Sequence, residues 1–152
     1  MLTLSSQYAL RALIYLALHE GEWPVPGRRI AEEAGIPARY LLKILGDLVR
    51  SGVLESSPGK SGGFRLRRPA DKTVLFDVLA PFEHFERRRC PFGNQECSDR
   101  KPCLAHDRWK KVIEAQQRFL QDATIYDVAV PLNGRRRPAK KKGRRGLDLA
   151  PM

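Results

Sequence analysis

All three cysteines of this 152-residue chain lie within one segment of 14 residues. The spacing is Cys90-x6-Cys97-x5-Cys103, and His106 follows after two further residues. The intervening residues are mostly Pro, Gly, Asn, Ser and Asp, which favour turns over strands. A helix is predicted from about Pro102, which would place Cys103 and His106 on one face of its first turn. Three thiols and one imidazole can then converge on a single centre, and this requirement restricts how the segment can fold.

The donor set alone leaves the chemistry of this centre open. Three cysteines and a histidine can bind zinc, but structural zinc sites usually pair ligands about two to four residues apart. The longer gaps here favour an iron–sulfur cluster, and the arginines and lysines nearby favour the thiolate form that binds metal. We read no signal peptide and no membrane span, so we expect a reducing compartment in which structural disulfides are rare. A redox-sensing disulfide and three unpaired thiols beside an exposed histidine are the alternatives.

Residues 28–50 have the pattern of a helix-turn-helix. A short helix is predicted over residues 28–34 and a longer one over 38–50, and Gly35, Ile36 and Pro37 form the turn between them. The second helix would bury Leu41, Ile44, Leu45 and Leu48 on one apolar face. It would present its other residues outward near its start, where recognition helices touch bases. An ordinary helical hairpin is the alternative. The candidate DNA-binding residues of this motif are Arg28, Ala38, Arg39, Tyr40, Leu42 and Lys43.

A predicted β-hairpin follows the helix-turn-helix directly. Residues 53–56 and 64–67 are the expected strands, because residues 64–67 alternate apolar and basic side chains. The turn between them is rich in glycine and cationic, as in the wing of a winged helix, where cations contact phosphates and glycines allow close approach of the backbone. A solvated hairpin without a DNA contact is the alternative. The candidate DNA-binding residues of the wing are Lys60, Gly62, Gly63 and Arg65.

Three more helices complete the predicted fold. One spans residues 5–20 with Ser5 or Ser6 as its cap, and a short one spans residues 74–80 with Thr73 as its cap. The third spans residues 102–123 and has two apolar stripes. One stripe includes Trp109, Val112 and Phe119, and the other contains Ile113 and Leu120. Because the chain has little other core to cover both stripes, we expect one of them to form a homodimer.

The charge of the chain is concentrated at one end. The net charge is +11, and residues 133–152 carry eight Lys or Arg and one Asp, which leaves +4 for residues 1–132. We therefore expect a mainly α protein in three parts: a winged helix-turn-helix over 1–70, a cysteine loop with a dimerisation helix over 71–132, and a disordered basic tail over 133–152. The tail either adds non-specific DNA affinity or is simply solvated. No phosphate loop or catalytic constellation is recognisable, so an enzyme is not expected.

This order of elements resembles the Rrf family of winged-helix transcription regulators, and most of all its IscR-like iron–sulfur branch. The resemblance runs from about residue 1 to 130 and is carried by residues 8–13, 36–41, 62–66 and, most specifically, 103–109. It implies a bacterial cytoplasmic homodimer that binds double-stranded promoter DNA, without a membrane partner, and represses or activates transcription. It also implies a cluster, commonly [2Fe–2S] rather than [4Fe–4S] or zinc. The ligands that it implies are Cys90, Cys97, Cys103 and His106.

The sequence departs from the IscR-like pattern at two points. The first cysteine gap has six residues where that branch usually has five, and other branches take a different fourth ligand, sometimes from the partner's N-terminal helix. Leu42 and Lys43 stand where IscR-like recognition helices have polar base-reading residues, so the operator sequence cannot be transferred. The expected function is a regulator that senses redox state, nitric oxide or iron through its cluster. The alternative is a zinc- or thiol-based winged-helix regulator.

Overall fold

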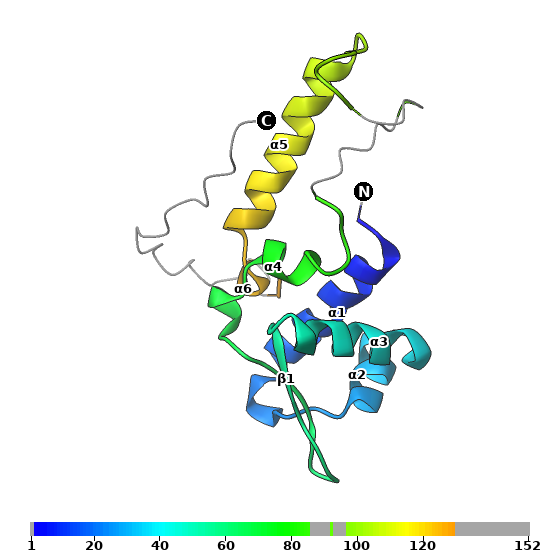
Figure 1. Cartoon of the computed structure of the whole chain (residues 1–152). Coiled ribbons are helices and arrows are strands. Elements are labelled where there is room, and N and C mark those ends of the chain that lie inside the picture. Colours follow the sequence, from blue (N-terminus) through cyan, green and yellow to red (C-terminus); the bar gives the residue numbers. More distant parts are fainter. Residues whose placement is uncertain (1, 86–91, 93–96, 130–152) are drawn as a thin grey trace.

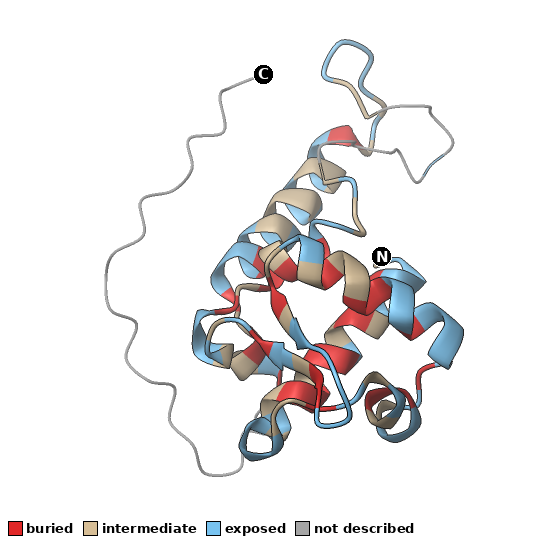
Figure 2. Ribbon diagram, turned by 60° about the horizontal axis from the view of Figure 1, so that its bottom comes forward, coloured by how far each residue is buried: buried red, intermediate tan, exposed pale blue. Residues whose placement is uncertain are grey.

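The computed structural model describes residues 2–85, 92 and 97–129. Within them the chain is mainly helical, with one two-stranded antiparallel hairpin, as predicted. Helix α1 is central, and α2, α3, α4 and α6 pack against it (Figure 1). Buried residues gather where these helices cross α1 (Figure 2). The elements are α1 (Leu4–Leu18), η1 (Glu20–Glu22), α2 (Gly27–Ala34), α3 (Ala38–Arg50), β1 (Leu54–Ser57), β2 (Gly63–Leu66), η2 (Ala70–Lys72), α4 (Leu75–Leu79), α5 (His106–Asp122) and α6 (Ile125–Ala129).

The cap of α1 is Thr3, not Ser5 or Ser6 as predicted. Thr3 has the extended backbone that a cap needs, and its hydroxyl accepts a hydrogen bond from the Ser6 amide at 3.2 Å. Ser6 lies inside the helix and donates its own hydroxyl to the Glu83 carboxylate at 2.5 Å. The Thr3 amide donates to the same carboxylate at 2.7 Å. The start of α1 is therefore held by a residue 77 positions away from Ser6, which a local pattern does not reveal.

The helix-turn-helix forms at the predicted positions. Gly35 ends α2 with a backbone φ of +64°, a conformation that glycine adopts without steric cost, and the Ile36 amide donates to the Ala31 carbonyl at 2.9 Å. Arg11 of α1 donates to the Ala34 and Gly35 carbonyl oxygens at 2.6 and 3.1 Å. The end of α2 is thereby tied to the central helix, which sets the orientation of the turn that leads into α3.

The wing pairs with the connector that precedes α2 as well as with itself. Strands β1 and β2 are antiparallel, with Leu54 opposite Leu66. Val25 and Phe64 exchange two backbone hydrogen bonds of 3.0 and 2.8 Å, which form an isolated antiparallel bridge between this connector and β2. A side chain on Gly62 would overlap the Ser57 carbonyl oxygen, and one on Gly63 would overlap that of Val25. The close packing of the chain on itself thus explains both glycines without invoking DNA.

The segment around α4 holds the end of α5. Thr73 is not the cap of α4, because its hydroxyl donates to the carbonyl oxygens of Arg68 and Pro69 at 3.2 and 3.0 Å. Its carbonyl oxygen accepts from the Ile125 amide, and the Leu75 amide donates to the Ala123 carbonyl, both at 2.9 Å. These two bonds join the segment before α4 to the junction of α5 and α6.

Helix α5 extends away from the body of the molecule (Figure 1). It has 17 residues, about 26 Å, and most of its length is half-buried or exposed (Figure 2). Of the two predicted stripes, the one with Leu120 packs inward, whereas Val112 and Phe119 of the other are 52% and 57% exposed. The two-stripe arrangement is thus present, and the Val112 and Phe119 part of one stripe is uncovered in the single chain. No helix in the described part of the chain is long and apolar enough to cross a membrane.

A carboxylate between α1 and α2 makes the stability of the fold depend on pH. Glu33 accepts from the Tyr15 hydroxyl at 2.5 Å and from Arg29 at 2.9 Å, and these two bonds hold its pKa below the usual 4.5. The contribution of Glu33 to stability is present above about pH 4.5. It is lost as the pH falls through the lower pKa that Glu33 has in the folded state.

We expect Tyr15→Phe to lower the urea midpoint of unfolding at pH 7, and the difference from the wild type to shrink as the pH falls toward 3. The reason is that protonated Glu33 no longer gains from the Tyr15 hydroxyl. Urea titrations across this range measure the effect. The control is Tyr40→Phe, because the Tyr40 hydroxyl bonds to Arg39 rather than to a carboxylate. A Tyr15→Phe deficit that is constant with pH would contradict the assignment.

Candidate DNA-binding surface and metal centre

The exposed face of α3 is the first part of the candidate DNA-binding surface. The residues predicted to face the core, Leu41, Ile44, Leu45 and Leu48, are all buried, which confirms the helical periodicity. The five predicted to face outward are all exposed, and Tyr40 and Leu42 retain 45% and 63% of their accessible surface. Those five residues are Ala38, Arg39, Tyr40, Leu42 and Lys43.

The predicted DNA-binding cations of this region differ in the contacts that they already form within the chain. Arg28 forms an exposed ion pair with Glu32 at 2.9 Å, and Arg39 donates to the Tyr40 hydroxyl at 2.9 Å while its guanidinium lies over the Tyr40 ring. Lys43 on α3 and Lys60 at the wing tip form no ion pair with any residue that the structure describes. Within the described residues, the two lysines therefore need to break no ion pair in order to meet a phosphate.

The wing arginine that was predicted to contact DNA is engaged across the hairpin. Arg65 lies opposite Glu55 in the strand register and donates to its carboxylate at 2.9 and 2.7 Å. Exposed ion pairs contribute only about 0–1 kcal/mol, so a phosphate can compete for this guanidinium. Gly62 and Gly63, in contrast, are buried against the chain itself.

The imidazole of His106 is the centre of the candidate metal site. It is only 5% exposed, and its two nitrogens face different partners. Nε2 lies 2.7 Å from an Asp99 carboxylate oxygen, and Nδ1 lies 3.3 Å from the Cys97 sulfur. The bonds from His106 and Lys110 hold the pKa of Asp99 below its usual value, so Asp99 is ionised and accepts the Nε2 proton. Nδ1 is left as the nitrogen that can bind metal, in the carboxylate–histidine arrangement common at metal sites.

Asp99 was not among the residues singled out from the sequence. Nothing in the spacing of the cysteines distinguishes it from Asp107, and both are acidic neighbours of the same histidine in the sequence. Only the turn over residues 98–101, closed by a bond from the Lys101 amide to the Ser98 carbonyl, brings the Asp99 carboxylate back to α5. The Lys110 ammonium, one turn further along α5, lies 3.3 Å from the same carboxylate oxygen.

The two remaining predicted ligands are placed differently. Helix α5 begins at His106 rather than near Pro102, so Cys103 is not in its first turn as predicted. Residues 104–105 form a turn instead, and the Cys103 carbonyl accepts from the His106 amide at 3.0 Å. Cys103 is half-buried, and Cys90 lies outside the described residues. Among residues 2–85, 92 and 97–129, no three Cys, His, Asp or Glu side chains converge as a metal site.

A tryptophan next to this site has an unsatisfied donor. Trp109 follows His106 by one turn of α5, and its indole N–H is buried without a hydrogen-bond acceptor in the part of the chain that the structure describes. The ring of Phe92 packs edge-on against it, with centroids 5.7 Å apart. A buried donor without an acceptor is costly, so a sulfur-rich group in this loop would have a partner ready for it. Donor chemistry and burial thus fit a metal or cluster held by this loop.

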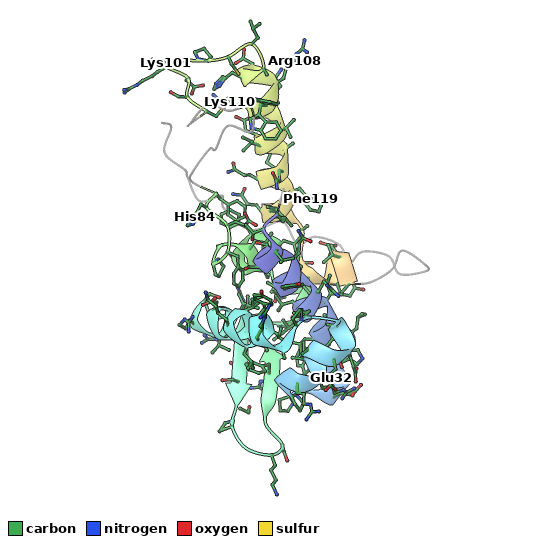
Figure 3. The ribbon with its side chains drawn as sticks, turned by 90° about the vertical axis from the view of Figure 1, so that its right-hand side faces the viewer. Glu32, His84, Lys101, Arg108, Lys110 and Phe119 are labelled. Atoms are coloured by element: carbon green, nitrogen blue, oxygen red, sulfur yellow. The ribbon has the colours of Figure 1, made fainter. Side chains whose placement is uncertain are left out.

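The candidate metal centre and the candidate DNA-binding surface lie at opposite ends of the molecule. The wing and α3 are at one end, and the outer end of α5 is at the other (Figure 1). Figure 3 shows Lys101, Arg108 and Lys110 around that outer end, far from Glu32 on α2. Within a single chain, any influence of the candidate metal centre on the candidate DNA-binding surface therefore has to pass through the helices between them.

When Asp99 is replaced by alanine, His106 is expected no longer to be held in a single tautomer. Without the carboxylate, the metal-free chain should show both neutral tautomers of His106 in long-range ¹H–¹⁵N NMR spectra, where the wild type shows the Nε2–H form alone. Affinity for Co²⁺, followed by its thiolate charge-transfer absorption, should fall about 10- to 100-fold. Asp107→Ala is the matched control, because Asp107 is exposed in the first turn of the same helix. An unchanged tautomer in Asp99→Ala would refute this role.

Comparison with known proteins agrees with the fold and the motifs. The model of the Rrf2 family, described as iron-dependent transcriptional regulator, matches residues 2–131. The transcriptional regulator IscR of Erwinia tasmaniensis is 32% identical over 128 residues, which cover 84% of this chain and 77% of that protein. The structure of T. potens IscR superposes with a TM-score of 0.67 at 25% identity, covering 84% of this chain and 85% of that one. The oxidized form of Staphylococcus aureus CymR superposes with a TM-score of 0.69 at 25% identity, covering 88% and 98%. The chain therefore belongs to the Rrf2 family of iron-dependent transcriptional regulators, and it is a winged helix-turn-helix regulator related to IscR.

Proposed function

We propose that this regulator is a cytoplasmic homodimer whose binding to palindromic promoter DNA depends on an iron–sulfur cluster. The observation that carries the proposal is the buried His106, which is held by Asp99 on one nitrogen and faces the Cys97 sulfur with the other. A histidine placed only for stability would not need its second nitrogen directed at a thiol. The relatives are transcriptional regulators, which argues against an enzyme.

The ligands in this proposal are Cys90, Cys97, Cys103 and His106. Helix α1 (Leu4–Leu18) contains no carboxylate, thiol or imidazole, which favours His106 over a ligand supplied by the N-terminal helix of a partner. When bound, a [2Fe–2S] cluster supplies a redox-active iron centre that responds to oxidants, nitric oxide or iron supply. We favour this cluster over [4Fe–4S] or zinc.

The residues between the two ends of the molecule give a route for coupling. His106 opens α5, whose far end is bonded to the segment before α4 through Ala123 and Leu75. Helix α4 packs on α1, and α1 holds the helix-turn-helix through Arg11. The cysteine loop would have one arrangement when its residues hold a cluster and another when they do not. The two arrangements would favour different placements of the two winged helix-turn-helix regions of the dimer. Such coupling is reciprocal, so operator DNA should in turn change the lability of the cluster.

On DNA, α3 would lie in the major groove while the wing lies along the backbone. In a homodimer the two copies of α3 would reach half-sites about one helical turn apart, ~34–36 Å. Lys43 and Lys60 supply phosphate contacts, and Arg28, Arg39 and Arg65 join them by exchanging their present partners. The basic residues 133–152 lie outside the described part of the structure, and we expect them to add non-specific, salt-dependent affinity.

The first test is purification of the full chain without oxygen, followed by absorbance, iron and sulfide measurements. A red-brown protein with about two irons and two sulfides per chain supports the proposal. Fluorescence anisotropy with a DNA duplex selected from a random pool should then differ between the loaded and the metal-free protein. A chain that stays colourless after anaerobic reconstitution overturns cluster dependence and leaves the DNA-binding assignment standing.

The second candidate is a zinc- or thiol-based regulator without a cluster. The likeness to the oxidized form of Staphylococcus aureus CymR favours it, together with the presence of three cysteines in one segment. Such a protein would be colourless and would contain either zinc or a reducible disulfide. Mass spectrometry under native conditions distinguishes these two forms from each other and from the cluster.

A further inference from the structure

The recognition helix presents one large apolar side chain on its exposed face. Leu42 keeps 63% of its accessible surface, whereas Leu41, Leu45 and Leu48 of the same helix keep 1% or less. Arg39, three residues before Leu42, is an exposed neighbour on the same face of α3, and Lys43 is exposed at the next position along the helix. An isobutyl group thus lies next to cationic side chains on the surface proposed to enter the major groove.

The position of Leu42 is supported by the neighbouring helix. Its Cδ2 lies 3.7 Å from the point that a Cβ on Gly27, the first residue of α2, would occupy. One methyl group therefore packs near the start of α2 while most of the side chain faces solvent. A side chain supported in this way reaches a base edge with little further loss of conformational freedom.

The chemistry of leucine limits what it can recognise in DNA. It has no donor or acceptor, so it cannot read the hydrogen-bonding pattern of a base edge. The one apolar group that the major groove displays is the C5-methyl of thymine. Burial of this methyl against a leucine is favourable, whereas a cytosine at the same place offers a polar amino group that leucine would desolvate without a partner.

We propose that Leu42 reads the C5-methyl group of a thymine in each half-site, while Lys43 binds a phosphate nearby. This inference rests on the proposed binding of DNA by α3. It assigns a specificity-determining role to a residue with no polar atom. From the value of about 0.8 kcal/mol for one buried carbon, each methyl is worth about fourfold in affinity, or about 15-fold for two half-sites.

The test uses the full chain, as purified without oxygen, and the DNA duplex selected from a random pool. Each thymine is replaced by uracil, symmetrically in both half-sites, which removes only the methyl group. We expect one position at which uracil lowers the affinity about 15-fold, and at which Leu42→Ala binds thymine and uracil DNA equally. At that position cytosine should weaken binding, and 5-methylcytosine should recover part of the loss.

Lys43→Ala is the matched control, because it should weaken binding and reduce its salt dependence while keeping the difference between thymine and uracil. Circular dichroism verifies that Leu42→Ala is folded, which the exposure of Leu42 leads us to expect. Equal affinity for thymine and uracil at every position overturns the inference, and so does an unchanged difference in Leu42→Ala. In both cases sequence-specific binding still supports the proposed function. Absence of any sequence-specific binding overturns both.

Discussion

Cys97→Ser is expected to abolish cluster assembly while the chain stays folded. Cys97 is the cysteine whose sulfur lies 3.3 Å from His106 Nδ1, and a serine hydroxyl is a poor ligand for iron at neutral pH. Iron and sulfide should fall from about two of each per chain to the background, and the visible absorbance should vanish. The fold should survive because Cys97 lies beside His106 at the start of α5 and is not part of the hydrophobic core.

The control for this experiment is Ser98→Ala. It alters the next residue of the same loop and removes the hydrogen bond that the Arg100 amide donates to the Ser98 hydroxyl, but it leaves every candidate ligand in place. Its iron and sulfide content should match the wild type. Normal iron content in Cys97→Ser would exclude Cys97 as a ligand. Unfolding of that variant in circular dichroism would show instead that the loop is needed for the fold.

Phe119→Asp is expected to convert the protein to monomers and to weaken its binding to a palindromic duplex about 100-fold or more. Phe119 and Val112 lie on the uncovered stripe of α5, and both are more than half exposed in the single chain. A charge buried in an apolar interface is costly, so the dimer should dissociate. Without a dimer, the second half-site no longer benefits from a high effective concentration. Analytical ultracentrifugation and anisotropy measure the two effects.

Gln121→Asp serves as the matched control for this substitution. It introduces the same carboxylate into α5, but at an exposed position on the opposite side of the helix from Phe119. We expect this variant to remain dimeric and to bind the palindrome with wild-type affinity. If Phe119→Asp also stays dimeric, the uncovered stripe of α5 is not the dimer interface, and the homodimer would have to be formed by another surface.

The helix-turn-helix was predictable because its determinants are local. The apolar spacing of residues 41–48 defines the buried face of α3, and Gly35 supplies the positive φ that ends α2. The exposed residues of α3 follow from the same periodicity. The wing was recognisable for a similar reason, since alternation over residues 64–67 and a glycine-rich turn specify a hairpin by themselves.

For the candidate metal centre, the sequence offered possible donors but not their geometry. Cysteine and histidine are metal-binding residue types, so the candidate ligands could be named from their identity and spacing in the sequence. The late start of α5 and the return of Asp99 toward His106 depend on turns whose residues have several conformations available. Arg65 is a comparable case, because its pairing with Glu55 follows from the strand register.

The sequence by itself determined the order of the elements, the buried face of α3 and the candidate donor residues of the cysteine segment, since each is encoded within a few neighbouring residues. The tertiary structure alone decided which serine or threonine caps a helix, which carboxylate orients His106 and which stripe of α5 stays uncovered. The physical reason is that a cap or an ion pair contributes only about 1 kcal/mol. Contacts of that size are selected by where the packed core brings distant residues together, as Glu83 is brought to Ser6.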